Sequence, residues 1–132
     1  MANCRLLVTL AVAMLSGCAV QHPKAEPPIS QELAQAIGES VAQYASALYP
    51  PAATKLHLSV AMDPGVGQSV SDALTHRGFG VSDGDGASGI QFDYTVESLN
   101  GRALVQVTTP GRAAACLVGD AISCDWTVRY DQ

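Results

Sequence analysis

The sequence predicts an α+β fold, a small two-layer domain in which two helices pack on a mostly antiparallel sheet of about five to six strands. Two patterns predict it. In the first half of the chain, two segments carry apolar residues at every third or fourth position, which is typical of amphipathic helices. In the second half, apolar and polar residues alternate in runs separated by turn residues, which is typical of antiparallel strands with one face in water.

The first helix is predicted over residues 30–48. Ser30 can cap its amino terminus, and the negative charge of Glu32 in the first turn favours the positive end of the helix dipole. One apolar stripe follows, made of Leu33, Ile37, Val41, Tyr44 and Leu48. Gly38 weakens the helix slightly, and the two prolines after Tyr49 end it. We interpret the stripe as core, with docking against a partner as the alternative.

A strand with one face in water is predicted over residues 55–62. Its apolar residues are Leu56, Leu58, Val60 and Met62, and they alternate with Lys55, His57 and Ser59. Asp63 then begins either a turn or a second helix, in which it would act as the cap. The apolar stripe expected on that helix consists of Val66, Val70, Ala73 and Leu74. Gly78 is expected at its left-handed end.

A short strand is predicted over residues 79–82, and a loop over residues 83–89 follows it. Asp83 and Asp85 in this loop hint at calcium binding. The other ligands of a calcium-binding EF-hand loop are missing, so we expect a flexible turn.

Asn100-Gly101 is the strongest local signal in the chain, because this dipeptide favours a two-residue hairpin turn. It joins strands predicted over residues 90–99 and 102–109. The pairs that such a turn implies are Leu99 with Arg102, Val96 with Val105, and Tyr94 with Val107. This register places the apolar residues of both strands on one face, so the turn chemistry and the hydrophobic pattern agree.

A second hairpin is predicted from residues 112–118 and 123–130, with a loop centred on Asp120. That register places Cys116 directly opposite Cys124, where a small movement allows a disulfide. The bond would stabilise a thin core by about 2–3 kcal/mol. The alternative is a pair of small buried residues that stay reduced. The residues expected on the same face as Cys124 are Trp126, Val128 and Tyr130.

The amino terminus is predicted to be a signal peptide. Arg5 precedes an apolar run that is too short to cross a bilayer, which needs roughly 20 apolar residues. Residues 15–18 read Leu-Ser-Gly-Cys, which resembles the lipobox of bacterial lipoproteins. The resemblance implies removal of residues 1–17 and lipid on Cys18. The alternative is an ordinary signal peptide with a chance cysteine near its end.

The mature chain is predicted to be a tethered domain. Residues 18–29 are polar and proline-rich and predict a flexible tether, and residues 30–132 predict a single periplasmic α+β domain. Ala19 follows the cysteine, which resembles outer-membrane lipoproteins by the sorting rule of enteric bacteria. We therefore expect a lipid anchor in the outer membrane, on its periplasmic face, in a Gram-negative bacterium.

The charged and polar residues predict no catalytic or nucleic-acid site. The net charge is −5 and the basic residues are scattered, so no basic stripe could bind nucleic acid directly. No catalytic constellation, metal-ligand spacing or cofactor motif occurs, so we expect no enzyme activity, cofactor, metal or small-molecule substrate. Asp72 and His76 lie four residues apart on a predicted helix, which leaves an unrecognised periplasmic hydrolase as an alternative.

Two segments in the middle of the chain form a distinctive pattern. Residues 48–56 read Leu-Tyr-Pro-Pro-Ala-Ala-Thr-Lys-Leu, and residues 77–81 read Arg-Gly-Phe-Gly-Val. Together with the lipobox, they resemble the TrbH conjugal transfer lipoproteins of Trb-type type IV secretion systems. The signature residues singled out are Tyr49, Pro50, Pro51 and Gly78. The chain departs from the family pattern at Phe79, where a tyrosine is usual, and in its cysteine pair.

The resemblance implies a structural lipoprotein of the mating-pair formation apparatus, which braces or assembles the outer-membrane part of the DNA-transfer channel. Its implied partners are the membrane, through lipid on Cys18, and the TrbG-like and TrbI-like channel subunits. The alternative function is an outer-membrane lipoprotein that regulates or scaffolds another envelope complex, such as the one for cell-wall synthesis.

Overall fold

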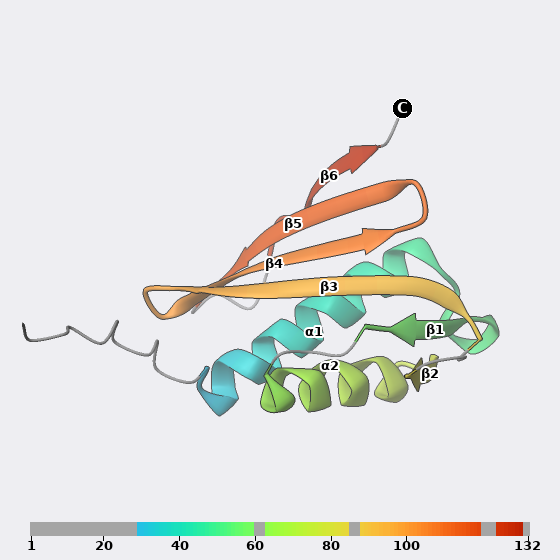
Figure 1. Ribbon diagram of the computed structural model, residues 1–132, viewed down its shortest axis with the longest axis horizontal. Helices are drawn as coiled ribbons and strands as arrows, with labels where there is room; N and C mark the ends of the chain where they lie inside the picture. Colours follow the sequence, from blue (N-terminus) through green and yellow to red (C-terminus); the bar gives the residue numbers. More distant parts are fainter. Residues whose placement is uncertain (1–28, 60–62, 85–87, 120–123, 131–132) are drawn as a thin grey trace, which may run out of the picture.

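The computed structural model describes residues 29–59, 63–84, 88–119 and 124–130, which form a layer of helices on a six-stranded sheet (Figure 1). The helices are α1 (Gln31–Leu48) and α2 (Pro64–His76), and a 3-10 turn, η1 (Pro51–Ala53), follows α1. The strands are β1 (Lys55–Leu58), β2 (Gly80–Asp83), β3 (Ile90–Leu99), β4 (Arg102–Thr109), β5 (Arg112–Val118) and β6 (Thr127–Tyr130). This architecture confirms the predicted α+β fold.

The first helix begins and ends where its sequence predicts. The Ser30 hydroxyl accepts a hydrogen bond from the backbone N–H of Leu33 at 3.1 Å, which satisfies one open donor of the first turn. The middle of the predicted apolar stripe is buried, and its two end residues are half-buried. The stripe is therefore part of the core.

Asp63 begins the second helix rather than a turn. Its Oδ1 accepts hydrogen bonds from the backbone N–H groups of Gly65 at 2.8 Å and Val66 at 3.2 Å. Pro64 takes the first helical position, where no N–H is needed. All four residues of the predicted stripe are buried. Gly78 follows the helix with a φ of +98°, the left-handed conformation predicted for it.

The sheet joins a parallel part to an antiparallel part. Its strand order is β2-β1-β3-β4-β5-β6. β1 runs parallel to β2 on one side and to β3 on the other, whereas β3 to β6 form an antiparallel meander. Because α2 connects β1 to β2, these three elements make a βαβ unit at one end of the sheet.

Two short strands differ from their predicted bounds. β2 begins at Gly80, because the N–H of Phe79 donates to the Leu74 carbonyl at 3.1 Å and so still belongs to the end of α2. Of the strand predicted over residues 55–62, the described part is β1, and residues 60–62 lie outside the described residues. The predicted loop after β2 also lies partly outside them.

The β3–β4 hairpin has the predicted register. Asn100 and Gly101 adopt φ values of +49° and +80°, the left-handed region that a two-residue type I′ turn requires. The predicted pairs that form are Leu99 with Arg102, Val96 with Val105, and Tyr94 with Val107. The turn dipeptide and the alternation therefore predicted this hairpin correctly.

The predicted β5–β6 register is wrong by two residues. The ladder pairs Ala115 with Thr127, and β6 begins there rather than at residue 123. Cys124 therefore lies ahead of the strand and not directly opposite Cys116. The connecting loop carries no Asn-Gly or Asp-Gly dipeptide that would set its length. Because side chains alternate with a period of two, the shift leaves the predicted faces of β6 unchanged.

The core lies between the sheet and the two helices. α1 packs on β4 and β5, while α2 packs on β2 and against α1. Large side chains that are fully buried there include Phe92 on β3, Ile37 on α1 and Leu74 on α2. Within the described ranges, no helix covers the opposite face of the sheet (Figure 1).

Candidate functional site

Two segments far apart in the sequence meet at one corner of the domain. Tyr49-Pro50-Pro51 leads the chain from α1 towards β1, and Gly78 leads it from α2 towards β2. A Cβ on Gly78 would lie 3.8 Å from the Cβ of Pro51, which is an ordinary contact distance. The two segments therefore lie against each other. We call these four residues the proline corner.

Hydrogen bonds hold the proline corner in place. The Tyr49 N–H donates to the Ala45 carbonyl at 2.9 Å and closes α1. The Thr54 hydroxyl donates to the Pro50 carbonyl at 2.7 Å, and the Gly80 N–H donates to the Thr54 carbonyl at 3.1 Å. Since the proline rings also restrict the backbone, the corner sets the direction in which the chain leaves α1 and enters the sheet.

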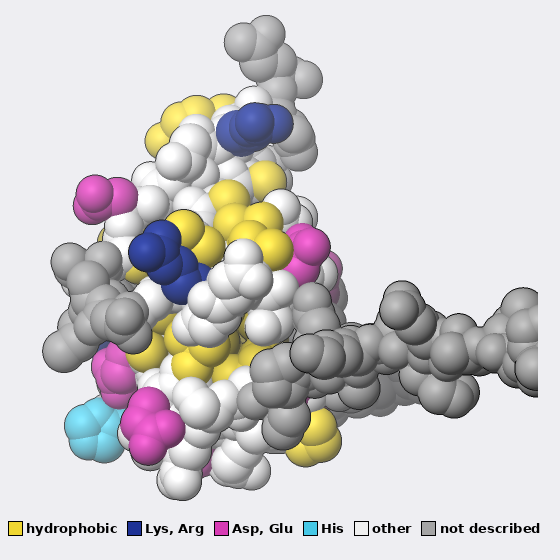
Figure 2. Space-filling model, turned by 90° about the vertical axis from the view of Figure 1, so that its left-hand side faces the viewer, with side chains coloured by type: hydrophobic (Ala, Val, Ile, Leu, Met, Phe, Trp, Pro, Cys, Tyr) yellow, Lys and Arg dark blue, Asp and Glu magenta, His cyan; other side chains and the backbone are white. Residues whose placement is uncertain are grey.

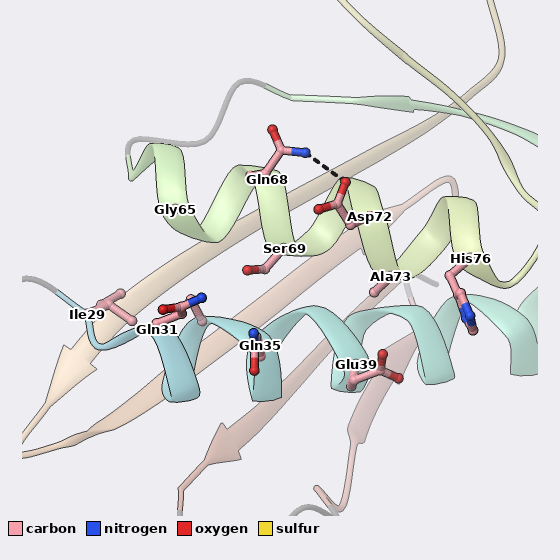
Figure 3. A pocket seen from close by; sticks show the side chains of 11 residues that line it. Ile29, Gln31, Gln35, Glu39, Gly65, Gln68, Ser69, Asp72, Ala73 and His76 are labelled. Carbon is pink, nitrogen blue, oxygen red and sulfur yellow. Dashed lines mark hydrogen bonds between the residues drawn. The ribbon is translucent and has the colours of Figure 1, made fainter.

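An open groove of about 790 Å³ runs between α1 and α2 (Figure 3). Its polar lining includes Gln31, Gln35 and Glu39 from α1 and Gln68, Ser69, Asp72 and His76 from α2. Both carboxylates already have partners. Glu39 lies 3.5 Å from the Arg77 guanidinium, and Asp72 accepts a hydrogen bond from Gln68 Nε2 at 2.7 Å.

Asp72 and His76 do not form an acid–base pair in this groove. The Asp72 side chain points towards Gln68, whereas His76 extends towards α1 (Figure 3). A general base needs its orienting carboxylate within hydrogen-bonding reach. The hydrolase alternative therefore receives no support from this geometry.

In the part of the chain that the structure describes, no group of three or more His, Cys, Asp or Glu side chains could hold a metal ion. No described helix is both long and apolar enough to cross a membrane. Cys18, the predicted lipid attachment point, lies outside the described residues, so its lipidation stays a prediction.

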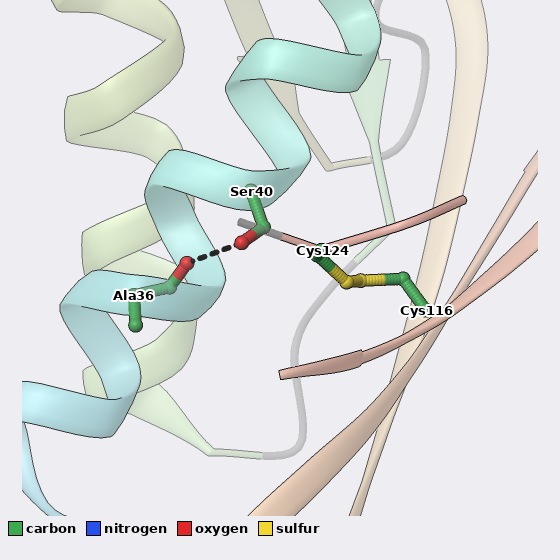
Figure 4. Close-up of a disulfide and its surroundings, with 4 residues drawn as sticks. All are labelled: Ala36, Ser40, Cys116 and Cys124. Carbon is green, nitrogen blue, oxygen red and sulfur yellow. Dashed lines mark hydrogen bonds between the residues drawn. A yellow bond between two sulfur atoms is a disulfide. The ribbon is translucent and has the colours of Figure 1, made fainter. Parts of the chain in front are cut away.

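A disulfide joins Cys116 of β5 to Cys124, with the two Cα atoms 5.8 Å apart (Figure 4). Cys116 is buried and Cys124 is half-buried against the core. Figure 4 shows the bond beside α1, near Ala36 and Ser40. The bond therefore attaches the segment ahead of β6 to the inner side of the sheet.

Aromatic contacts attach the same segment to α1. The rings of Trp126 and Tyr44 stack with their centroids 4.6 Å apart. Burial raises the pKa of Tyr44 above its ordinary value of 10.0, and the positive charge of Arg112 partly offsets this rise. The Arg112 guanidinium also lies 5.4 Å from the ring centroid of Tyr130. The alternation places Trp126 on the inner face, but no local signal in the sequence indicates its contact with Tyr44.

Over residues 17–115, the chain matches the family described as conjugal transfer protein TrbH. The chain belongs to the TrbH family. No curated protein and no solved structure matches it significantly. The TrbH region includes both helices, the proline corner and the sheet as far as the middle of β5.

The limits of the TrbH region separate two groups of cysteines. The region begins at Gly17, so Cys18 lies within it. It ends at Ala115, one residue before Cys116. The disulfide and β6 therefore lie outside the part of this chain that matches TrbH.

Proposed function

We propose that this TrbH-family protein is a structural lipoprotein of a conjugative type IV secretion apparatus. It braces or assembles the outer-membrane part of the DNA-transfer channel and has no catalytic role. The match to the conjugal transfer family over residues 17–115 carries this proposal. The diverging Asp72 and His76 side chains are consistent with it, because they leave the groove without an evident acid–base pair.

Lipid on Cys18 supplies the anchor in this proposal. One acyl chain binds a membrane only marginally, whereas each buried methylene adds about 0.8 kcal/mol, so two or three chains anchor stably. The proline-rich residues 19–28 then act as a spacer. At about 3.1 Å per residue, an extended spacer of this length reaches about 30 Å from the membrane.

The proposed partners are the periplasmic channel subunits of the TrbG-like and TrbI-like kinds. Confinement to one membrane face raises the effective concentration of the domain near such subunits, so modest contacts suffice for assembly. Direct binding of the transferred DNA is not part of the proposal, since the chain has a net charge of −5 and scattered basic residues.

Deletion of the gene from its conjugative element tests the role in transfer. We expect the transfer frequency to fall and to recover when the full chain is supplied in trans. Affinity purification of the tagged chain from donor membranes is expected to recover channel subunits. Normal transfer from the deletion strain, together with recovery of cell-wall enzymes, would favour the alternative of an envelope regulator.

A further inference from the structure

The face of the sheet that points away from the helices carries its side chains in aligned rows. Residues paired in register project from the same side of a sheet, so the strand pairing defines each row. The first row across β3, β4, β5 and β6 is Asp93, Thr108, Ala113 and Arg129. The second is Thr95, Gln106, Ala115 and Thr127. The third, on β3 to β5, is Glu97, Leu104 and Leu117.

A shallow groove of about 280 Å³ follows β5 across the first two rows. Its floor consists of the small side chains of Ala113 and Ala115. One wall consists of Gln106 and Thr108 of β4, and the other of Thr127 and Arg129 of β6. Beside it, Leu117 is 46% exposed. Viewed from the end that carries the β3–β4 turn, the surface shows hydrophobic side chains among charged ones (Figure 2).

We propose that this face binds a second copy of the same chain, face to face, about a two-fold axis that runs parallel to the strands between β4 and β5. With this axis, β3 of one copy faces β6 of the other, and β4 faces β5. Each row of one copy then faces the same row of the other copy. The β4 wall of each copy then enters the alanine-floored groove of the other. In the third row, Leu104 meets Leu117 of the second copy.

Charge complementarity selects a second copy as the occupant. The same axis places Asp93 opposite Arg129 of the second copy, and this contact occurs twice. Among the described residues, neither side chain takes part in an ion pair. The only side-chain hydrogen bond of Asp93 there is the one that its Oδ1 accepts from Gln91 Nε2 at 2.6 Å. Within one copy, Asp93 and Arg129 lie three strand spacings apart, about 14 Å. This separation exceeds the screening length of about 8 Å in physiological salt, so the two charges complement each other only between copies.

The size of the face predicts a modest affinity. Four strands span about 19 Å, and the seven residues of β5 extend about 23 Å. A plan area of about 400 Å² per copy, or about 800 Å² in total, is smaller than a standard specific interface and is in the range of weak, transient ones, for which we expect a dissociation constant in the micromolar range or weaker. Sheets packed face to face usually cross at about −30° between their strand directions, so facing rows stay close to each other near the axis. Arg129 lies outside residues 17–115, the part of the chain that matches TrbH. The proposed surface is therefore specific to this chain and is not a general property of the matched region.

Sedimentation equilibrium of the full chain, in density-matched detergent at up to about 100 μM, tests the proposal. The wild type is expected to form a dimer. Asp93→Arg and Arg129→Asp are each expected to weaken the dimer at least about tenfold, since like charges then meet twice. The double variant, which exchanges the two charges, is expected to restore the affinity to within about threefold. Asp83→Arg, on the far edge strand β2, is the matched control and should change nothing.

A second pair of variants fills the groove instead of changing the ion pair. Ala115→Glu is expected to abolish the dimer, whereas Ala53→Glu on the exposed η1 turn should leave it intact; circular dichroism confirms that each variant is folded. A monomeric wild type at every concentration overturns the proposal. It is also overturned by a dimer that tolerates both charge reversals, or by single variants that the double variant does not rescue. A wild type that stays monomeric is the result expected if this face binds another protein instead.

Discussion

Gly38 of α1 lies directly against the backbone of Ser69 in α2. A Cβ on Gly38 would lie 2.5 Å from the Ser69 carbonyl oxygen and 2.7 Å from the carbonyl carbon, closer than packed atoms approach. Because the obstacle is backbone, it cannot rotate away as a flexible side chain would. The absence of a side chain at Gly38 therefore sets how closely the two helices pack.

Gly38→Ala is expected to lower the free energy of unfolding by about 1–3 kcal/mol through overpacking between the helices. The effect opposes intrinsic helix propensity, which favours alanine over glycine by about 1 kcal/mol. Urea unfolding of the full chain measures the change. Gln43→Ala, at an exposed position of the same helix, is the control and should stay within about 0.5 kcal/mol of the wild type. Equal or greater stability of Gly38→Ala would contradict the helix contact described here.

In the proposed periplasmic location, the disulfide is expected to form and to stabilise the domain. Since Cys116 and Cys124 are 8 residues apart, replacing both by alanine should lower the free energy of unfolding by about 2–3 kcal/mol. Each single alanine variant should lose a similar amount. Thermal unfolding with and without reductant measures the effect, and reduced wild type should approach the double variant.

Alkylation followed by intact-mass measurement checks the redox state independently. In protein purified from the membrane fraction without reductant, Cys116 and Cys124 should stay unmodified, and reduction should make both available to the reagent. An alkylated pair in the unreduced protein would show that these cysteines stay as thiols.

Stability is expected to fall at alkaline pH because of two buried tyrosines. Burial raises the pKa values of Tyr44 and Tyr94 above the ordinary value of 10.0. The folded state thus holds these protons more tightly than the unfolded state does. The resulting stabilisation is complete below about pH 10 and is lost as the pH rises through the folded pKa values. Chemical unfolding at several alkaline pH values should show this loss.

The variants Tyr44→Phe and Tyr94→Phe identify which hydroxyl is responsible. Each should flatten the alkaline decline, while Tyr130→Phe, at an exposed position, should change it less, because Tyr130 acts on Tyr44 only through its negative charge. Tyrosinate absorbance measured during the same titration should show two groups that ionise above the ordinary tyrosine pKa of 10.0. An alkaline decline of the same size in both buried-site variants would rule out these tyrosines as its source.

Local signals predicted much of the fold. Ser30 and the Asn100-Gly101 turn bring their own hydrogen-bonding or conformational preference, so the start of α1 and the β3–β4 register follow from a few neighbouring residues. All four residues of the apolar stripe predicted on α2 are buried, because their helical spacing places them on one face of the helix. Where the chemistry of a short segment decides the structure, the sequence is sufficient.

Contacts between distant segments were not predictable in the same way. The parallel pairing of β1 with β3 has no turn that connects the two strands directly, so no local residue sets it. The sequence of α1 alone indicates only that Gly38 weakens this helix, whereas its role in packing depends on Ser69 of α2. The β5–β6 register was wrong because its loop has no strong turn dipeptide. For the candidate site, the sequence indicates the signature residues, but only the fold shows that Gly78 lies beside Pro51.

The transfer frequency of a donor that carries Cys18→Ala tests the central claim most directly. In a strain complemented only by this variant, the protein should leave the membrane fraction and transfer should fall towards that of the deletion strain. Cys4→Ala, inside the predicted signal peptide, is the matched control and should support normal transfer. Normal transfer with an unanchored Cys18→Ala protein would contradict the proposal that this TrbH-family chain acts as a lipoprotein of the conjugation channel.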